Sequence, residues 1–215
     1  MRIRLLLAGI LAFAAVATAQ TPAVPDLHLR GDRFKPLTYG ELTPEQKTMV
    51  EHLLTGERGT LNGPFNVMLR SPEMGDAAQK LGAYIRFHTS VPTKLNEFAI
   101  LITARGLNVQ YEWAAHHKLA LQAGLSPAII EAVATGKKPT GMQADEEIVY
   151  NFAHELVNTH QVSDAAYHAA VDKFGEHTVV DLIGTIGYYH FVSMMLNVDR
   201  YPMPEGAQPE LKPLH

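Results

Sequence analysis

A hydroxyl residue followed directly by proline recurs in this chain at Thr43-Pro44, Ser71-Pro72 and Ser126-Pro127. The hydroxyl can accept a hydrogen bond from the free amides at a helix start, and proline is favoured at the first helical position, where its missing amide costs nothing. After each of these pairs the apolar residues recur at helical spacing. The pattern therefore predicts a fold that is built from helices.

No segment shows a sustained alternation of apolar and polar residues, so we expect no strand. The chain is predicted to be all-α, a single domain of about seven or eight helices. We expect helices over residues 43–57, 72–88, 92–106, 109–123, 127–135, 143–159, 164–174 and 176–197, with a short helical turn over 65–70.

Residues 1–19 have the features of a Sec-type signal peptide. Two arginines precede an apolar run over residues 5–16, and small residues at 17–19 form a cleavage site. No later segment reaches roughly 18 uninterrupted apolar residues, so we expect no membrane anchor. The sequence therefore predicts an exported protein, periplasmic or secreted, whose mature chain begins near Gln20.

The mature chain is expected to contain an extended N-terminal arm over residues 20–42, one helical domain over 43–200 and an extended C-terminal tail over 201–215. The whole chain has 18 basic and 22 acidic residues and 0 cysteines. The excess of acids argues against a nucleic-acid partner. Without cysteine, disulfides, thiolate ligands and cysteine nucleophiles are excluded.

The histidines do not complete a known metal motif. His154-Glu155 begins like the zinc-protease motif H-E-x-x-H, but Asn158 stands where the second histidine is needed. Glu112 and His116 are four positions apart, whereas the Glu-x-x-His pair of di-iron bundles requires three. No G-x-S-x-G turn or phosphate-binding glycine loop occurs. We therefore expect neither a metal nor an organic cofactor.

Two carboxylates and a histidine lie within apolar helical sequence in the middle of the chain. Glu112 and His116 are four apart, so they share one helix face. On an exposed face such a pair would contribute only a few tenths of a kcal/mol and would need no function. Here Glu97 lies in an apolar run and Glu112 lies between Tyr111 and Trp113, so burial is expected. Burial raises a carboxyl pKa and a nearby carboxylate raises that of histidine, which favours a proton-transfer site.

Other charged residues could extend this site. Arg70, Arg86 and Arg105 are candidates to bind an anionic substrate, and each could equally hold a helix end or pair with an acid. His117 must point away from its neighbour and is expected at a surface or interface. His190 lies on a mostly apolar helix, where it could line the same pocket or be a hydrogen-bonded core residue.

Several motifs between residues 63 and 198 occur together in one known group of proteins. They are Gly63-Pro-Phe-Asn-Val-Met-Leu-Arg-Ser-Pro-Glu-Met, Glu97-x-Ala-Ile-Leu, Tyr111-Glu-Trp-x-x-His116, and Gly187-Tyr-Tyr followed by Leu196-Asn197. On these motifs the chain resembles the carboxymuconolactone decarboxylase and alkylhydroperoxidase D-like (AhpD-like) superfamily. The resemblance implies an all-helical subunit that assembles as an obligate oligomer, a trimer, hexamer or related ring.

The peroxidase branch of that superfamily carries a Glu, eleven residues, and then Cys-x-x-Cys-x-x-x-His. In this chain Glu97 and His116 match the Glu and the His, while Val109 and Glu112 stand at the two cysteine positions. The resemblance therefore implies a retained scaffold without thiol chemistry. A Tyr-x-Trp-x-x-His pattern without cysteines is similar to the decarboxylase branch.

This resemblance implies a carbon–carbon lyase that acts without cofactor on a small anionic or lactone-like substrate. His116 would be the general acid, and Glu112 would set the tautomer and the pKa of His116. Glu97 would relay a proton or orient the imidazole. Isomerisation or hydrolysis by the same groups is an alternative, as is a non-catalytic exported protein that binds a small ligand. The expected substrate-binding residues are Arg70, Arg105, Tyr111 and Trp113.

Overall fold

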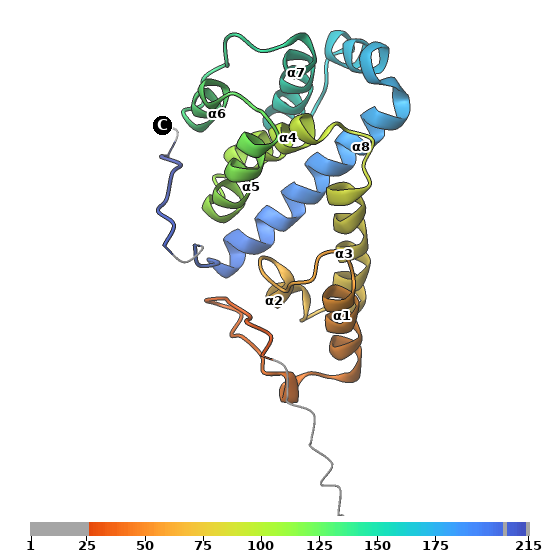
Figure 1. Ribbon diagram of the computed structural model, residues 1–215, viewed down its shortest axis with the longest axis vertical. Helices are drawn as coiled ribbons and strands as arrows, with labels where there is room; N and C mark the ends of the chain where they lie inside the picture. The colour runs from red at the N-terminus through yellow and green to blue at the C-terminus, as the bar shows by residue number, and fades with distance from the viewer. Residues whose placement is uncertain (1–25, 204–205, 214–215) are drawn as a thin grey trace, which may run out of the picture.

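The computed structural model describes residues 26–203 and 206–213. The expected signal peptide and the first part of the N-terminal arm lie outside these residues. Within them the chain forms eight α-helices, one short 3₁₀-helix and no strand, as Figure 1 shows, which confirms the all-α prediction. The elements are η1 (Tyr39–Glu41), α1 (Pro44–Thr55), α2 (Phe65–Met68), α3 (Pro72–Phe87), α4 (Thr93–Gly106), α5 (Gln110–Gln122), α6 (Pro127–Ala134), α7 (Ala144–Thr159) and α8 (Asp164–Asp199).

The three hydroxyl–proline pairs lie where α1, α3 and α6 begin, but among them only Thr43 caps its helix through the hydroxyl. At α1 the Gln46 amide donates to Thr43 Oγ1 at 3.3 Å, and the Thr43 amide donates to Gln46 Oε1 at 2.9 Å. This reciprocal pair is a capping box. At α3 and α6 the preceding Ser71 and Ser126 make no capping hydrogen bond. Proline in the first turn is therefore the signal that these two starts share with α1.

The longest helix, α8, joins two of the expected helices across a kink. Gly175 adopts a φ of +80°, a conformation that residues with a side chain rarely adopt, and the chain changes direction there. Length and composition alone would let α8 cross a membrane, but 56% of the apolar window is buried inside the structure. Since α8 packs against α4 and α7, it serves as a core helix of the fold.

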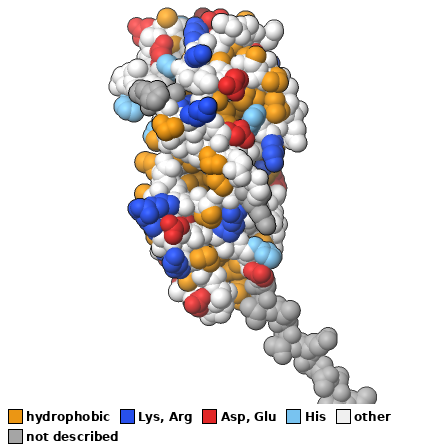
Figure 2. All heavy atoms as spheres, turned by 90° about the vertical axis from the view of Figure 1, so that its left-hand side faces the viewer, with side chains coloured by type: hydrophobic (Ala, Val, Ile, Leu, Met, Phe, Trp, Pro, Cys, Tyr) orange, Lys and Arg blue, Asp and Glu red, His pale blue; other side chains and the backbone are white. Residues whose placement is uncertain are grey.

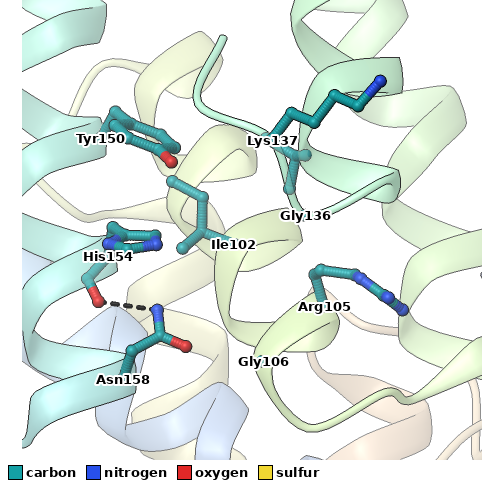
Figure 3. Close-up of a pocket in the computed structure, with 9 residues that line it drawn as sticks. Ile102, Arg105, Gly106, Gly136, Lys137, Tyr150, His154 and Asn158 are labelled. Atoms are coloured by element: carbon teal, nitrogen blue, oxygen red, sulfur yellow. Dashed lines mark hydrogen bonds between the residues drawn. The ribbon is translucent and has the colours of Figure 1, made fainter. Parts of the chain in front are cut away.

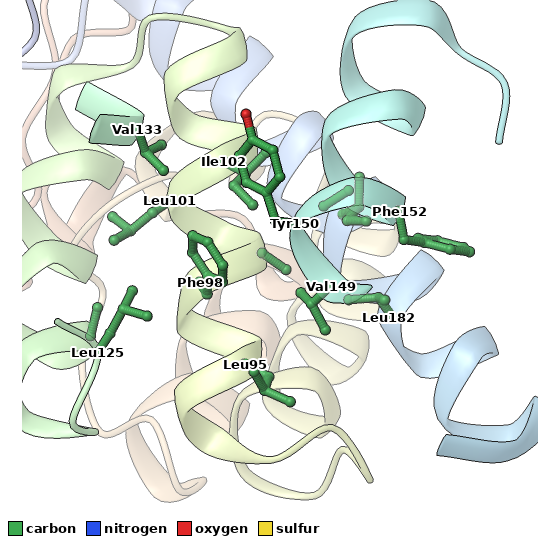
Figure 4. Close-up of a cluster of buried hydrophobic side chains, with 14 of the residues drawn as sticks. Leu95, Phe98, Leu101, Ile102, Leu125, Val133, Val149, Tyr150, Phe152 and Leu182 are labelled. Atoms are coloured by element: carbon green, nitrogen blue, oxygen red, sulfur yellow. The ribbon is translucent and has the colours of Figure 1, made fainter. Parts of the chain in front are cut away.

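Helix α4 lies at the centre of the molecule. Every residue from Leu95 to Arg105 is buried, because α5, α6, α7 and α8 all pack around this helix. Figure 4 shows one side of it, where Phe98 and Leu101 join a core with Phe152 of α7 and Leu182 of α8.

A second apolar cluster lies on another side of α4 and is built from the N-terminal helices and the end of α8. It contains Ile100 of α4 together with Phe65 of α2, Met49 of α1 and Val192 of α8. A helix that is apolar nearly all round can bury its side chains in two clusters at once. Any polar side chain between Leu95 and Arg105 is therefore enclosed by the fold.

The described part of the C-terminal tail, residues 206–213, is extended and lies against the start of α5. The amides of Glu210 and Leu211 donate to Gln110 Oε1 at 3.1 and 3.0 Å, and Gln110 Nε2 donates to the Leu211 carbonyl at 2.6 Å. Leu211 is buried in the same core as Phe98. The tail therefore packs against α5, the helix that carries Glu112 and His116.

Candidate active site

Helices α4 and α5 bring the three expected proton-transfer residues together. Glu97 lies on α4, and Glu112 and His116 lie one turn apart on α5. Glu97 Oε2 is 2.7 Å from His116 Nδ1, and Glu112 Oε2 is 3.3 Å from His116 Nε2. The exposed fractions of Glu97, Glu112 and His116 are 6%, 4% and 3%. The imidazole is therefore buried with one carboxylate at each ring nitrogen.

The two carboxylates favour the charged form of this imidazole. Burial acts to lower the pKa of His116, but the hydrogen bonds to Glu112 and Glu97, together with their charges, raise it to about 9. An imidazolium carries an N–H on each nitrogen, so it can donate to both carboxylates. At neutral pH His116 therefore holds a proton on each side of its ring.

An aromatic neighbour fixes the orientation of the ring. Tyr189 of α8 lies edge-on to His116, with ring centroids 4.8 Å apart and an angle of 84° between the planes. Burial, followed by the nearby Glu112 and Glu97 charges, raises the pKa of Tyr189 well above its ordinary value, so the phenol stays neutral.

A buried polar link holds α4 in place beside Glu97. Thr185 Oγ1 of α8 donates to Asn96 Oδ1 at 2.8 Å, and Asn96 Nδ2 donates to the Ile85 carbonyl of α3 at 3.1 Å. Both bonds are buried, where an unpaired polar group would be costly. They therefore fix the register of α4 against α3 and α8, and with it the position of Glu97.

A cavity of about 230 Å³ opens beside the imidazole. Glu112 and His116 line it, whereas Glu97 does not, so Glu97 lies behind the imidazole as seen from the cavity. Two cations, Arg58 and Arg86, also line this space. Its aromatic walls come from Tyr111, Tyr188 and Tyr189. The arrangement can hold a small ligand against a charged histidine.

The two arginines that line this cavity are not paired with an acidic side chain among the described residues. Within the part of the chain that the structure describes, neither Arg58 nor Arg86 forms a salt bridge or donates a side-chain hydrogen bond. The sequence singles out Arg86 as a candidate to bind an anion, but it does not single out Arg58. Arg58 lies in the loop between α1 and α2, where no helical spacing relates it to other residues, and only its cationic side chain could have drawn attention.

The expected substrate-binding residues separate in the structure. Tyr111 lines the cavity beside His116. Trp113 is buried, and its Nε1 donates to Glu210 Oε2 at 3.0 Å, away from the cavity. Arg70 Nη1 donates to the carbonyl and to Oδ1 of Asn66, each at 2.8 Å, and its Nη2 donates to a carbonyl of the N-terminal segment. Arg70 therefore joins two segments and does not line the cavity.

Arg105 lies at a different cavity, of about 180 Å³, between α4, α7 and the loop after α6. Figure 3 shows its side chain on one side of that space and Tyr150, His154 and Asn158 of α7 on the other. Its Nη2 donates to the Lys212 carbonyl at 2.8 Å, so it also anchors the C-terminal tail. Arg105 is therefore separated from His116 by the body of α4.

The other histidines considered from the sequence lie outside the His116 cavity. His117 Nδ1 is 2.6 Å from Glu210 Oε2, at the surface beneath the C-terminal tail. His190 is half-buried on α8 and does not line the cavity. His154 stacks on Tyr150 with ring centroids 5.2 Å apart. Among the described residues, no group of three or more histidine and acidic side chains is arranged to hold a metal ion.

Neither a protein-family model nor a curated protein matches this sequence. Solved structures do share its fold. An uncharacterised peroxidase-related protein from Ralstonia eutropha JMP134, with an alkylhydroperoxidase AhpD core, superposes with a TM-score of 0.63 at 15% identity, over 83% of this chain and 94% of that one. A protein of unknown function from Agrobacterium tumefaciens gives 0.58 at 16% identity, over 66% and 99%.

The debrominase Bmp8 gives a TM-score of 0.59 at 13% identity, over 79% of this chain and 91% of that one. A variant of Bmp8 with a cysteine replaced by alanine has been solved in complex with 2,3,4-tribromopyrrole. These similarities confirm the predicted resemblance at the level of fold: the chain has an AhpD-like helical fold, and proteins with this fold include enzymes.

Proposed function

We propose that this chain is an exported enzyme with carboxymuconolactone decarboxylase-like chemistry, in which acid/base groups convert a small anionic substrate without a cofactor. The observation that carries the proposal is the buried imidazole of His116, held between Glu97 and Glu112 at the wall of a cavity that Arg58 and Arg86 also line. Burying three ionised groups is costly, and such groups collect where proton transfer is needed.

Decarboxylation of an unsaturated lactone acid requires one proton. The bond between the ring carbon and the carboxylate breaks, CO₂ leaves, and the electron pair moves into the conjugated carbonyl. His116 then delivers its Nε2 proton to carbon and regains a proton from water. The substrate is its own electron sink, which is why no cofactor is proposed.

The geometry supports different roles for the two carboxylates. The sequence predicts that Glu112 sets the tautomer of His116, whereas the contacts favour Glu97 for that role. Glu97 binds Nδ1 at 2.7 Å from behind the ring, so in this mechanism Glu97 holds the Nδ1 proton and sets the tautomer that remains after transfer. Glu112 faces the cavity at the longer distance of 3.3 Å from Nε2. Its weaker contact leaves the Nε2 proton accessible to substrate, while its charge keeps the imidazole protonated.

A thiol peroxidase mechanism is not proposed, although a peroxidase-related protein shares the fold. That chemistry needs cysteine, and the chain has 0. Val109, at one cysteine position, is a buried residue directly before α5, and Glu112 occupies the other. The same helix terminus therefore presents a carboxylate where a thiol would stand.

Self-association is proposed together with this activity. Large apolar side chains are exposed along one face of α8, at Val180, Ile183, Met194 and Val198. Spacings of three, four and eleven residues place them on one stripe. Figure 2 shows one face of the molecule, on which hydrophobic patches lie between charged groups. The stripe suits a second copy of the chain, and Ile183→Glu should reduce the native mass measured by light scattering.

The test of the function is turnover of a panel of unsaturated lactone carboxylates and acyclic unsaturated acids in deuterated water. We expect release of CO₂ and one deuterium on the product carbon with the wild-type protein, and loss of both in folded His116→Gln. His117→Gln is the matched control, because it changes the adjacent histidine outside the cavity and should keep its rate.

Full turnover by His116→Gln would remove His116 from the mechanism. Binding of the panel by the wild-type protein without any chemical change would favour the alternative, a non-catalytic exported protein that binds a small ligand. Export itself rests on residues 1–19, and fractionation of cells that express the full chain would test it.

A further inference from the structure

The guanidinium of Arg58 lacks the hydrogen bonds that a buried cation normally makes. Its Nε and Nη2 atoms are shielded from water and have no hydrogen-bond partner among the described residues. The group lies over the ring of Phe65, with Cζ 5.0 Å from the ring centroid. A buried donor without a partner costs roughly 1–3 kcal/mol. A ligand that satisfied these donors would recover that cost.

The two unpaired atoms lie on the same edge of the guanidinium. Nε–H and Nη2–H are parallel donors, and this edge matches the two oxygens of a carboxylate. Arg58 lines the cavity that contains His116, so a rotation of its terminal group would present this edge to a ligand there. The geometry therefore suits a carboxylate more than a neutral group.

The position of Arg58 depends on a missing side chain in α3. A Cβ atom added to Gly82 would lie 2.9 Å from Arg58 Nη2 and 2.1 Å from the Tyr188 hydroxyl. Such distances are too short for packed atoms, so glycine makes room for both groups. The fold thus accommodates a cation and a phenol at one end of the cavity.

Arg86, at the end of α3, adds a second cation to the same cavity. Burial raises the pKa of Tyr188, and the charges of Arg58 and Arg86 both oppose that rise. Both guanidinium groups therefore act on the tyrosine pair that encloses His116. An anion placed between them would be attracted by two charges.

The charges around the cavity are not balanced. Two carboxylates, Glu97 and Glu112, face three cations, His116, Arg58 and Arg86, so one positive charge is in excess. An anionic ligand would offset that excess, whereas a neutral ligand would leave it uncompensated. The volume of about 230 Å³ is below the range of drug-sized pockets, so the ligand must be small.

We propose that Arg58, with Arg86, binds the one carboxylate that the substrate keeps through the reaction, and that the ligand class is a small lactone or unsaturated acid with such a carboxylate. Binding there directs the reacting carbon toward His116. This inference rests on the proposed function at His116, because the carboxylate that leaves as CO₂ must be a different one.

The probe is γ-carboxy-γ-butyrolactone, a small lactone with one carboxylate, beside its methyl ester. Titration calorimetry on the folded mature protein should detect binding of the acid and at least about tenfold weaker binding of the ester, since one charge-assisted interaction is worth about 1.5–3 kcal/mol. Arg58→Gln should weaken binding of the acid by a similar factor, and Arg58→Lys should weaken it less. Arg33→Gln, an exposed arginine elsewhere, is the control.

Equal binding of acid and ester by the wild-type protein would overturn the inference, and that comparison needs no variant. Wild-type affinity for the acid in folded Arg58→Gln would also overturn it. A turnover assay beside the binding assay separates this inference from the proposed function. If the wild type binds the acid through Arg58 but converts no substrate, carboxylate binding at Arg58 stands and the proposed function fails.

Discussion

The charged state of His116 should make the stability of the protein depend on alkaline pH. Its folded-state pKa of about 9 is raised above the ordinary histidine value near 6.5. A group with a raised folded pKa contributes stability that is complete below the unfolded pKa and is lost as pH rises through the folded pKa. The stabilisation from His116 should therefore decline between about pH 7 and pH 9.5.

The size of the decline follows from the two pKa values. With about 9 in the folded and about 6.5 in the unfolded state, the linkage relation gives a loss of roughly 2 kcal/mol between pH 7 and pH 9.5. Urea unfolding of the wild-type protein and of His116→Gln at both pH values would measure it. Tyrosines and lysines titrate in both proteins, so the difference between the two pH dependences isolates His116.

A wild-type protein that loses about 2 kcal/mol more than His116→Gln over this interval would support the reasoning. If the two proteins showed the same pH dependence, His116 would not carry a raised pKa. The contacts at 2.7 and 3.3 Å would then not describe a charged imidazole.

Three further perturbations test separate parts of the structure. Glu97→Gln removes the charge 2.7 Å from Nδ1 and should lower the pKa of His116 by about one to two units in an NMR titration; an unchanged value would contradict the assigned contact. Gly82→Ala should cost about 1–3 kcal/mol in urea unfolding, because its Cβ would meet the Tyr188 hydroxyl, and wild-type stability would refute the close approach. Leu211→Ala should cost about 2 kcal/mol or more by the same assay, and no loss would mean that the tail does not pack into the core.

The helices could be predicted from local sequence because their signals are local. The proline at the first position of α1, α3 and α6 and the apolar spacing of α4 lie within a few residues of the structure they specify. Gly175 separates two expected helices, and in the structure its φ of +80° and ψ of 160° interrupt the helical backbone of α8 at that residue.

The site could be predicted only in part. The spacing of Glu112 and His116 is a local property of α5, and the apolar run around Glu97 predicts its burial. Arg105 is eight residues from Glu97 on the same helix, a rotation of roughly 80° beyond two full turns, so the two side chains leave α4 in different directions. This rotation explains why Arg105 reaches another cavity.

Arg58 shows what local sequence could not supply. It lies in an irregular loop, and only the packing of α2, α3 and α8 brings it to the cavity beside His116. Glu210 is a second example, since it meets Trp113 and His117 from a tail almost one hundred residues away. Contacts between residues so far apart in the sequence depend on the assembled fold.

The most direct test of the central claim is the protonation state of His116 at neutral pH. Nitrogen-15 NMR of histidine-labelled protein, with the signal assigned by its loss in His116→Gln, would report both ring nitrogens. The account predicts an N–H on each nitrogen at pH 7 and titration near 9, which is the state that can donate Nε2–H to a substrate carbon. A ring that is already neutral at pH 7 would contradict it.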